Sequence, residues 1–336
     1  MKDALSNVTR DARETPTVSV VIPAYNAAAH VGDALASVFG QTFRDYELIV
    51  VNDGSPDTPE LERALAPYAE KLIYIRQENA GPSAARNAGV RRARGRFVAF
   101  LDSDDVWERE YLAEQLKAFE EDASLDLVYA DALIVGDTAL AGKSFMQCHP
   151  SRGRVSAEAL LREDCTVLTS CVVARRQTLL DAGLFDEKFR RSEDFDLWVR
   201  MAHNGARLGY RRKVLARHRR HGQSLTSDYM PMYDSQLEVF AKLRDVLEGD
   251  ARLRGLAEWR LKRCAAEREL ERGKRCFVEG RYAESSASLA RANEFFRSWK
   301  LRLALLLLRA APRLLRRAYL TRHRSSPPDV MIALRR

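Results

Sequence analysis

Residues 96–105 read RFVAFLDSDD, an apolar run that passes directly into a cluster of carboxylates. A run of this length predicts a buried strand. If the backbone stays extended beyond Leu101, Asp102 and Asp104 face the same side, because side chains along a strand alternate with a period of two. Two such carboxylates repel each other unless a cation lies between them, and a divalent metal carrying a diphosphate is a common partner for oxygen ligands. The alternative is that the aspartates only end the strand and cap the next segment.

Two further apolar runs precede this one, and each ends in polar residues. The first is VSVVIPAYN at 18–26, followed by a helical pattern from His30 to Phe39, and the second is ELIVVNDGS at 47–55. Strands that alternate with helices predict an α/β fold with a mostly parallel sheet, and such sheets bind ligands beyond the carboxyl ends of their strands. We therefore expect Tyr25, Asp53 and the later aspartates at one edge. Neither a Gly-x-Gly-x-x-Gly loop nor a Gly-Lys-Ser/Thr loop follows these runs, which argues against a Rossmann dehydrogenase or a P-loop enzyme.

A second acidic cluster, at 193–196, opens a helical pattern. Leu197, Trp198 and Met201 fit a buried stripe on that helix, and acidic residues are favourable near the positive N-terminal end of any helix. This structural reading accounts for the body of the helix. It leaves the first turn, with Glu193 and Asp194, available to face a cleft.

Taken in order, five segments resemble the motifs of family 2 glycosyltransferases. They are Val20–Asn26, Val50–Ser55, Asn79–Gly89, Phe100–Asp105, and Gly183–Asp186 together with Ser192–Trp198. Each motif is weak alone, but their common order makes the resemblance strong. It extends over residues 17–226.

The resemblance implies a fold of the GT-A type at residues 16–228, with a nucleotide-binding half at 16–105 and an acceptor half at 106–228. It also implies transfer of a sugar, with inversion at the anomeric carbon, from a nucleotide diphosphate donor such as a UDP-sugar to a saccharide or lipid-linked saccharide. The residues that it places around the donor are Pro23, Tyr25, Asn26, Asp53, Arg86, Asp102 and Ser103.

Within that set, the resemblance assigns the nucleotide base to Asp53, with Arg86 nearby, and the ribose to Asp102. Asp104 would hold Mg²⁺ or Mn²⁺ on the diphosphate. Asp194 would be the general base that takes the proton of the acceptor hydroxyl, supported by Glu193. The chemistry fits this division, because a metal acts where negative charge develops on the leaving group and a single base is needed on the opposite face.

Two more segments bear on the site. Residues 217–226, RHRRHGQSLT, contain His221, which would complete the metal shell or contact the diphosphate, although a basic loop that attracts phosphate explains the segment nearly as well. Residues 169–176 are rich in small and β-branched side chains and predict a core strand between the two halves of the site. Cys171 in that segment is then a small buried hydrophobe.

The composition of the chain bears on its cellular location and on its C-terminal region. The chain has 336 residues, 46% of them hydrophobic, a formal net charge of +8 and five cysteines at irregular spacing. Free thiols and a polar start at residues 1–15 predict a cytoplasmic protein without a signal peptide. From residue 229 to 336 the composition predicts a helical region, with a helical hairpin between Ala257 and Asn293.

The most basic part of this region is 299–324, with eight Lys or Arg and no Asp or Glu. Leu301, Leu305, Leu308 and Leu315 recur at near-helical spacing, and Pro312 is expected to interrupt the helix. A basic amphipathic helix predicts a peripheral position at an anionic membrane surface, on the inner face of the cytoplasmic membrane. A helix that covers the preceding domain is an equally good interpretation.

Two other functions remain open on the sequence. A sugar-phosphate nucleotidyltransferase also uses paired aspartates and Mg²⁺, but it would carry a Gly-rich basic loop after the first strand, where Pro23-Ala24-Tyr25-Asn26 stands. A non-catalytic basic protein that binds membrane or nucleic acid is permitted by the pI near 9.3. No groove of aromatic and Arg residues is evident in the sequence, and we expect no nucleic-acid partner.

Overall fold

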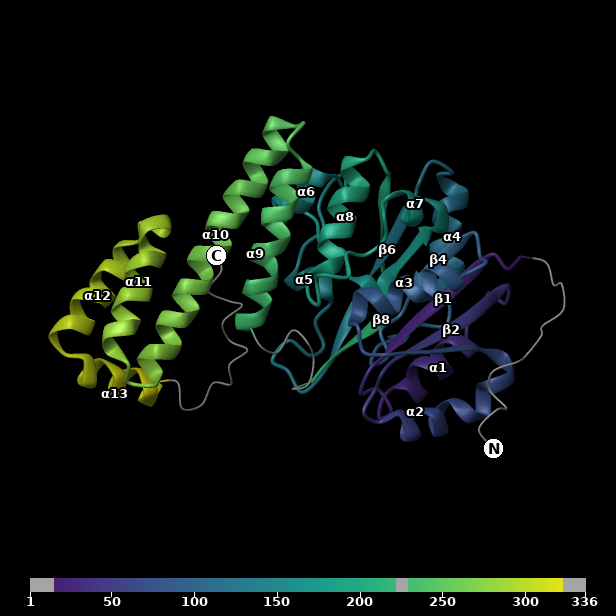
Figure 1. Ribbon diagram of the computed structural model, residues 1–336, viewed down its shortest axis with the longest axis horizontal. Helices are drawn as coiled ribbons and strands as arrows, with labels where there is room; N and C mark the ends of the chain where they lie inside the picture. The colour runs from purple at the N-terminus through teal and green to yellow at the C-terminus, as the bar shows by residue number, and fades with distance from the viewer. Residues whose placement is uncertain (1–14, 222–228, 323–336) are drawn as a thin grey trace. The chain divides into compact units, whose positions relative to one another are not determined.

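The computed structural model describes residues 15–221 and 229–322 (Figure 1). They fall into two compact units that divide after His221. The domain boundary predicted after residue 228 lies outside the described residues, and the division predicted after residue 105 stays a prediction.

A mixed sheet of eight strands forms the centre of the first unit, in the order β3-β2-β1-β4-β7-β6-β8-β5. Strands β1 to β4 pair in parallel with one another, β6 pairs in parallel with β8, and β7 and β5 run antiparallel to their neighbours. The mostly parallel α/β sheet predicted from the sequence is confirmed. The strands are β1 Val18–Ala24, β2 Tyr46–Asp53, β3 Ile73–Gln77, β4 Phe97–Phe100, β5 Val106–Trp107, β6 Leu127–Gly136, β7 Val172–Arg175 and β8 Leu208–Arg220.

Helices cover both faces of this sheet, and short 3₁₀ segments (η) lie in two of the connections (Figure 1). The α-helices of the first unit are α1 Val31–Phe39, α2 Thr58–Leu65, α3 Pro82–Arg92, α4 Tyr111–Glu121, α5 Phe145–Cys148, α6 Ala157–Leu161, α7 Arg176–Asp181 and α8 Glu193–His203. The 3₁₀ segments are η1 Ala66–Lys71 and η2 Thr169–Cys171.

The two faces of β1 show how the sequence selects this packing. Val18, Val20 and Ile22 share a core cluster with the buried face of α1. Val21 lies on the opposite face, because side chains alternate along a strand, and there α3 packs so closely that a Cβ on Gly89 would lie 2.3 Å from Val21 Cγ1. A glycine at position 89 therefore allows α3 to approach β1 and brings its N-terminal half to the edge where the strands end.

The second unit consists of helices in the described residues. They are α9 Tyr229–Val246, α10 Ala251–Val278, α11 Tyr282–Phe296, α12 Trp299–Ala310 and α13 Pro312–Arg322. Helices α10 and α11 confirm the predicted hairpin, and Pro312 interrupts the last helix as expected. No described helix combines the length and the apolar character required to cross a bilayer.

Candidate active site

The first acidic cluster lies in a turn beyond β4. This strand ends at Phe100, and the amide of Asp105 donates to the carbonyl of Asp102 at 3.1 Å. The expectation that Asp102 and Asp104 share one side of an extended backbone is therefore wrong, because the chain turns between them. They still interact: burial, followed by the charges of Asp105 and Asp102, raises the pKa of Asp104 to about 6. A carboxylate in such surroundings is stabilised by a cation.

Arg86 joins the two acidic clusters. It lies on α3 with its side chain 7% exposed, and it donates from Nη2 to Asp102 Oδ1 at 2.7 Å and from Nη1 to Glu193 Oε1 at 2.6 Å. Its guanidinium carbon also lies 5.5 Å from the centre of the Phe185 ring. The turn after β4 and the start of α8 are thus fixed to one side chain, although they are far apart in the sequence.

The pKa values of the two carboxylates that Arg86 binds shift in opposite directions. Burial alone would raise the pKa of Asp102, but the charge and hydrogen bond of Arg86 hold that pKa below its ordinary value. For Glu193 burial dominates, so its pKa is raised although Arg86 and its own backbone amide oppose the rise. The Arg86 pKa is itself raised, because its two carboxylate partners outweigh its burial.

Asp194 follows Glu193 in the first turn of α8, but its hydrogen bonds go to residues other than Arg86. Its Oδ2 accepts the hydroxyl proton of Thr169 at 2.8 Å, and its Oδ1 accepts the amide of Phe195 at 2.8 Å. The helix body behaves as predicted, with Leu197, Trp198 and Met201 buried. A carboxylate held by two donors and left half-exposed has the orientation and access that a general base requires.

Thr169 and Ser170 are site residues that the sequence did not reveal. They were expected in a core strand, but β7 begins only at Val172, and both residues lie in η2. Ser170 accepts the amide of Asp102 on its hydroxyl at 3.2 Å and the indole of Trp107 on its carbonyl at 2.7 Å. A hydroxyl pair directly before an apolar strand was the available signal, because such residues bond to backbone and carboxylate groups at strand ends. Cys171 is fully buried, as predicted.

The end of β8 returns to the first acidic cluster. His221 Nε2 lies 3.0 Å from Asp104 Oδ2, which brings together the two residues predicted to hold the metal. His218 Nδ1 lies 3.1 Å from Asp105 Oδ2, and although burial favours neutral His218, the Asp105 charge raises its pKa. Arg219 closes the arrangement by donating its amide to Asp105 Oδ1 at 2.8 Å and its Nε to the carbonyl of Asp104 at 3.0 Å.

These residues fit a divalent cation. Mg²⁺ and Mn²⁺ are held in nucleotide enzymes by one or two protein ligands together with phosphate oxygens. Asp104 and His221 supply two converging ligand atoms, and the carboxylates of Asp102 and Asp105 add negative charge near them. Within residues 15–221 and 229–322, no group of three or more His, Cys, Asp or Glu side chains is arranged to hold a metal without such help.

The ends of β1 and β2 form the other side of the edge. Asp53 is buried, and its carboxylate accepts from the Gln77 side chain at 2.8 Å and from the amides of Ala80 and Gly81 at 2.9 and 2.8 Å. A carboxylate has about four acceptor positions, so Asp53 keeps room for one more donor. It orders the loop before α3 and retains the capacity to accept an N–H group of a base.

Neighbouring residues leave the same edge open to a ligand. Asn26 adopts a left-handed φ of 51° and donates its amide to Ser55 Oγ at 2.6 Å. Tyr25 is 54% exposed, while Pro23 and Ser103 are half-buried. A cavity of about 590 Å³ opens beside Asp104, with Asp33, Trp107 and Arg219 in its wall.

Comparison with known sequences decides the family. Residues 19–181 match the sequence model described as "Glycosyl transferase family 2". The chain belongs to glycosyltransferase family 2. It is therefore a glycosyltransferase, which is a different class of transferase from the sugar-phosphate nucleotidyltransferase that the sequence left open, and it is an enzyme rather than a non-catalytic binding protein.

Several related proteins share this assignment. An uncharacterized glycosyltransferase of Rickettsia prowazekii is 29% identical over 240 residues, which cover 68% of this chain and 70% of the relative. One of Methanocaldococcus jannaschii is 29% identical over 211 residues, covering 61% and 71%. One of Rickettsia conorii is 30% identical over 207 residues, covering 60% of this chain but only 32% of that longer relative.

Solved structures share the fold of this family 2 glycosyltransferase. TarS of S. aureus, residues 1–349 in complex with UDP-GlcNAc, superposes with a TM-score of 0.58 at 20% identity, covering 91% of this chain and 92% of TarS. The mannosyltransferase PcManGT of Pyrobaculum calidifontis, in complex with GDP-Man and Mn²⁺, gives a TM-score of 0.55 at 20% identity, covering 95% and 85%. The GT-A-type fold expected from the sequence is confirmed.

Proposed function

We propose that this glycosyltransferase moves a sugar from a nucleotide diphosphate sugar, most directly a UDP-sugar, to a hydroxyl of a saccharide or lipid-linked saccharide, with inversion at the anomeric carbon. The observation that carries the proposal is the Arg86 link, which holds the aspartate turn beside the start of α8. The solved relatives of like fold, with UDP-GlcNAc in one and GDP-Man and Mn²⁺ in the other, support a nucleotide-sugar donor.

In this proposal the aspartate turn and the β1 and β2 loops bind the donor. Asp53 accepts an N–H of the base at its remaining position, and Asp102, fixed by Arg86 and Ser170, accepts a ribose hydroxyl. Pro23, Tyr25, Asn26 and Ser103 line the approach. Asp104 and His221 would hold Mg²⁺ or Mn²⁺, which when bound supplies positive charge at the leaving diphosphate.

Asp194 carries the proton transfer. The acceptor hydroxyl gives its proton to the Asp194 carboxylate while its oxygen forms the new bond to the anomeric carbon, and the diphosphate leaves with the electron pair of the old bond. Attack from the face opposite the leaving group inverts the configuration. Thr169 and the Phe195 amide orient the carboxylate, and Glu193 fixes the start of α8 through Arg86.

The deciding experiment measures nucleotide-sugar hydrolysis and UDP binding by Asp104→Asn and by the wild type in chelator. We expect both treatments to abolish turnover and to weaken UDP binding together, because they remove the charge that faces the diphosphate. Asp137→Asn, an exposed aspartate after β6, is the matched control and should behave as the wild type. Full turnover in chelator would contradict metal dependence, and failure to hydrolyse or bind any nucleotide sugar would contradict the donor class.

The proposed acceptor also bears on where in the cell the enzyme works. A lipid-linked saccharide is presented at a membrane surface, and a peripheral position at the inner face of the cytoplasmic membrane would bring the enzyme to it. The basic segment 299–324 is the part of the chain that suits such a position, and its described residues end at Arg322.

A further inference from the structure

Helix α12 carries two apolar faces. Leu301, Leu305 and Leu308 pack into the core of the second unit, where Leu308 joins Phe277 and Leu289. The sequence predicted that these leucines, with Leu315, would form an apolar stripe of a membrane-bound or domain-covering helix. In the structure this stripe is used for packing within the second unit, so it is not available to a membrane.

The other face of α12 is also apolar, and it is exposed. Trp299 is 68% exposed and Leu306 is 62% exposed, with Leu303 and Leu307 beside them. At about 100° per residue, positions 299, 303 and 306 fall on one side of the helix, opposite to Leu301 and Leu308. Leu314 of α13 adds a further apolar side chain that is 71% exposed.

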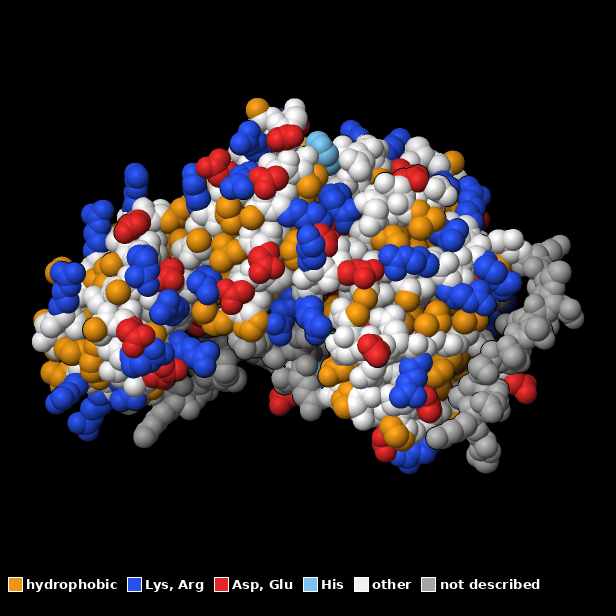
Figure 2. Space-filling model, viewed as in Figure 1, with side chains coloured by type: hydrophobic (Ala, Val, Ile, Leu, Met, Phe, Trp, Pro, Cys, Tyr) orange, Lys and Arg blue, Asp and Glu red, His pale blue; other side chains and the backbone are white. Residues whose placement is uncertain are grey.

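Cations flank this exposed face. Arg302 and Arg309 lie along one side of it and Lys300 along the other, and Arg313 and Arg317 follow on α13, all exposed. Among the described residues, no carboxylate forms an ion pair with any of these five. In contrast, the arginines of the neighbouring helices α10 and α11 are mostly paired with Glu or Asp. In Figure 2 the part of the second unit formed by α11 to α13 shows hydrophobic side chains with Lys and Arg around them.

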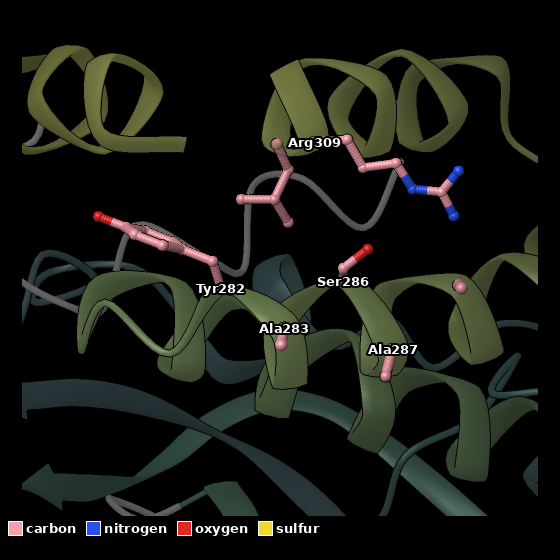
Figure 3. A pocket seen from close by; sticks show the side chains of 7 residues that line it. Tyr282, Ala283, Ser286, Ala287 and Arg309 are labelled. Carbon is pink, nitrogen blue, oxygen red and sulfur yellow. The ribbon is translucent and has the colours of Figure 1, made fainter. Parts of the chain in front are cut away.

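A groove of about 470 Å³ lies between α11 and α12, on the side of α12 that carries Leu308 and Arg309. Figure 3 shows Tyr282 and Arg309 toward opposite ends of it, with Ala283, Ser286 and Ala287 along the α11 side. The small side chains leave the surface next to Arg309 hollow and largely apolar.

We propose that the exposed face of α12, formed by Trp299, Leu303, Leu306 and Leu307, docks on an anionic membrane surface at the depth of the lipid headgroups. Apolar side chains flanked by cations match the chemistry of that layer, in which hydrocarbon and negative charge lie within a few ångströms of each other. Helix α12 has 12 residues and is too short to span a bilayer, so it lies along the surface.

Charge favours this occupant over a second copy of the chain. Two copies that met through α12 would bring their unpaired cations together, and the repulsion would oppose association. An anionic bilayer instead neutralises them. The docking deepens the membrane position proposed above by naming the face that makes the contact, and it does not depend on the proposed reaction, because it uses residues of α12 and α13 alone.

The experiment is flotation of the full-length protein with vesicles of phosphatidylcholine, either pure or with about a third of phosphatidylglycerol. We expect binding only to the anionic vesicles and a decline as salt rises, because exposed charges are screened beyond ~10 Å at 0.1 M salt. Arg302→Glu/Arg309→Glu should weaken binding by at least about 25-fold, since each basic residue near the surface contributes about fivefold. The charge-matched control is Arg92→Glu/Arg254→Glu, two exposed arginines elsewhere, which should bind as the wild type.

The apolar part is tested by Leu303→Ser/Leu306→Ser, with Val246→Ser, an exposed valine of α9, as the control. We expect the double variant to lose anionic vesicle binding by tenfold or more while keeping the wild-type UDP affinity and nucleotide-sugar hydrolysis. Docking is overturned if the wild type does not bind anionic vesicles at low salt. It is likewise overturned if Arg302→Glu/Arg309→Glu and Leu303→Ser/Leu306→Ser both float as well as the wild type. It is also overturned if Leu303→Ser/Leu306→Ser instead dissolves a stable oligomer, because the face would then be a protein interface. None of these outcomes changes the donor hydrolysis that tests the proposed reaction.

Discussion

Arg86 and Arg291 perform the same geometric task in two different environments. Each arginine donates from a helix to a carboxylate on another helix: Arg86 of α3 to Glu193 of α8, and Arg291 of α11 to Glu269 of α10, both with nitrogen–oxygen distances of 2.6 Å. The Arg86 side chain is 7% exposed, whereas the Arg291 side chain is 51% exposed. The two Arg–Glu pairs have like charges and distances, but they differ in burial and in the second carboxylate, Asp102, that Arg86 also binds.

That difference determines what each pair can do. Water around Arg291 screens the attraction and offers alternative hydrogen bonds, so the pair adds little to stability. Around Arg86 there is little water, so the carboxylates of Asp102 and Glu193 depend on one guanidinium, and their positions depend on it too. Burial thus makes a salt bridge a device that fixes the geometry of the site.

The largest expected effect is the loss of transfer activity on substitution of Asp194. This residue sharpens the comparison because it is next to Glu193 in the sequence but is not hydrogen-bonded to Arg86. We expect Asp194→Asn to lower transfer by ~10²–10⁴-fold, the usual contribution of a general base, and to leave UDP affinity nearly unchanged. Steady-state turnover and calorimetric UDP titration measure the two quantities. Equal losses in affinity and turnover would instead place Asp194 in the nucleotide pocket.

Arg86 should give the largest change in stability. Replacing it by Met leaves the buried Glu193 carboxylate and the partly exposed Asp102 carboxylate without a counter-charge, and removing one partner of a buried ion pair typically costs ~3–5 kcal/mol. We expect Arg86→Met to lower the free energy of unfolding of the first unit by about that amount. Urea denaturation, monitored by the fluorescence of the buried Trp107 and Trp198, measures this change.

The matched control also replaces the two carboxylates that Arg86 binds by neutral amides. Arg86→Met/Asp102→Asn/Glu193→Gln should recover part of the lost stability, because no buried charge is then uncompensated, but it should not recover transfer. A stable Arg86→Met single variant with wild-type turnover would show that the link does not hold the site together.

The contrast between these regions also explains what the sequence could predict. Strand runs such as 18–23 and 96–101 and the helix of Glu193 follow from local periodicity, and the structure contains them. The pairing of Arg86 with Glu193, 107 residues away, is a tertiary contact that no local pattern encodes. The family resemblance placed these residues in one site, but it did not show that they touch.

Local rules also failed where two structures compete for the same residues. The period-two argument for Asp102 and Asp104 assumed that the strand continued, whereas Asp and Ser favour the turn that the chain adopts there. For 299–322 the leucine spacing correctly predicted a helix but not which of its apolar faces would be buried. That choice depends on Phe277 and Leu289, which lie on other helices.

The smallest expected effect completes the comparison at Arg291. Its substitution by Gln keeps a long polar side chain on α11 and removes only the charge that faces Glu269. Exposed ion pairs contribute ~0–1 kcal/mol, so we expect the free energy of unfolding of the second unit to fall by no more than that, at low salt and in urea. In 1 M salt the Debye length is ~3 Å, and the wild type and Arg291→Gln should then become indistinguishable. A loss of several kcal/mol that persists in high salt would mean that the Arg291 pair orders α10 against α11 as strongly as Arg86 orders the active site. Burial would then no longer explain the difference between the Arg291 pair and the Arg86 pair.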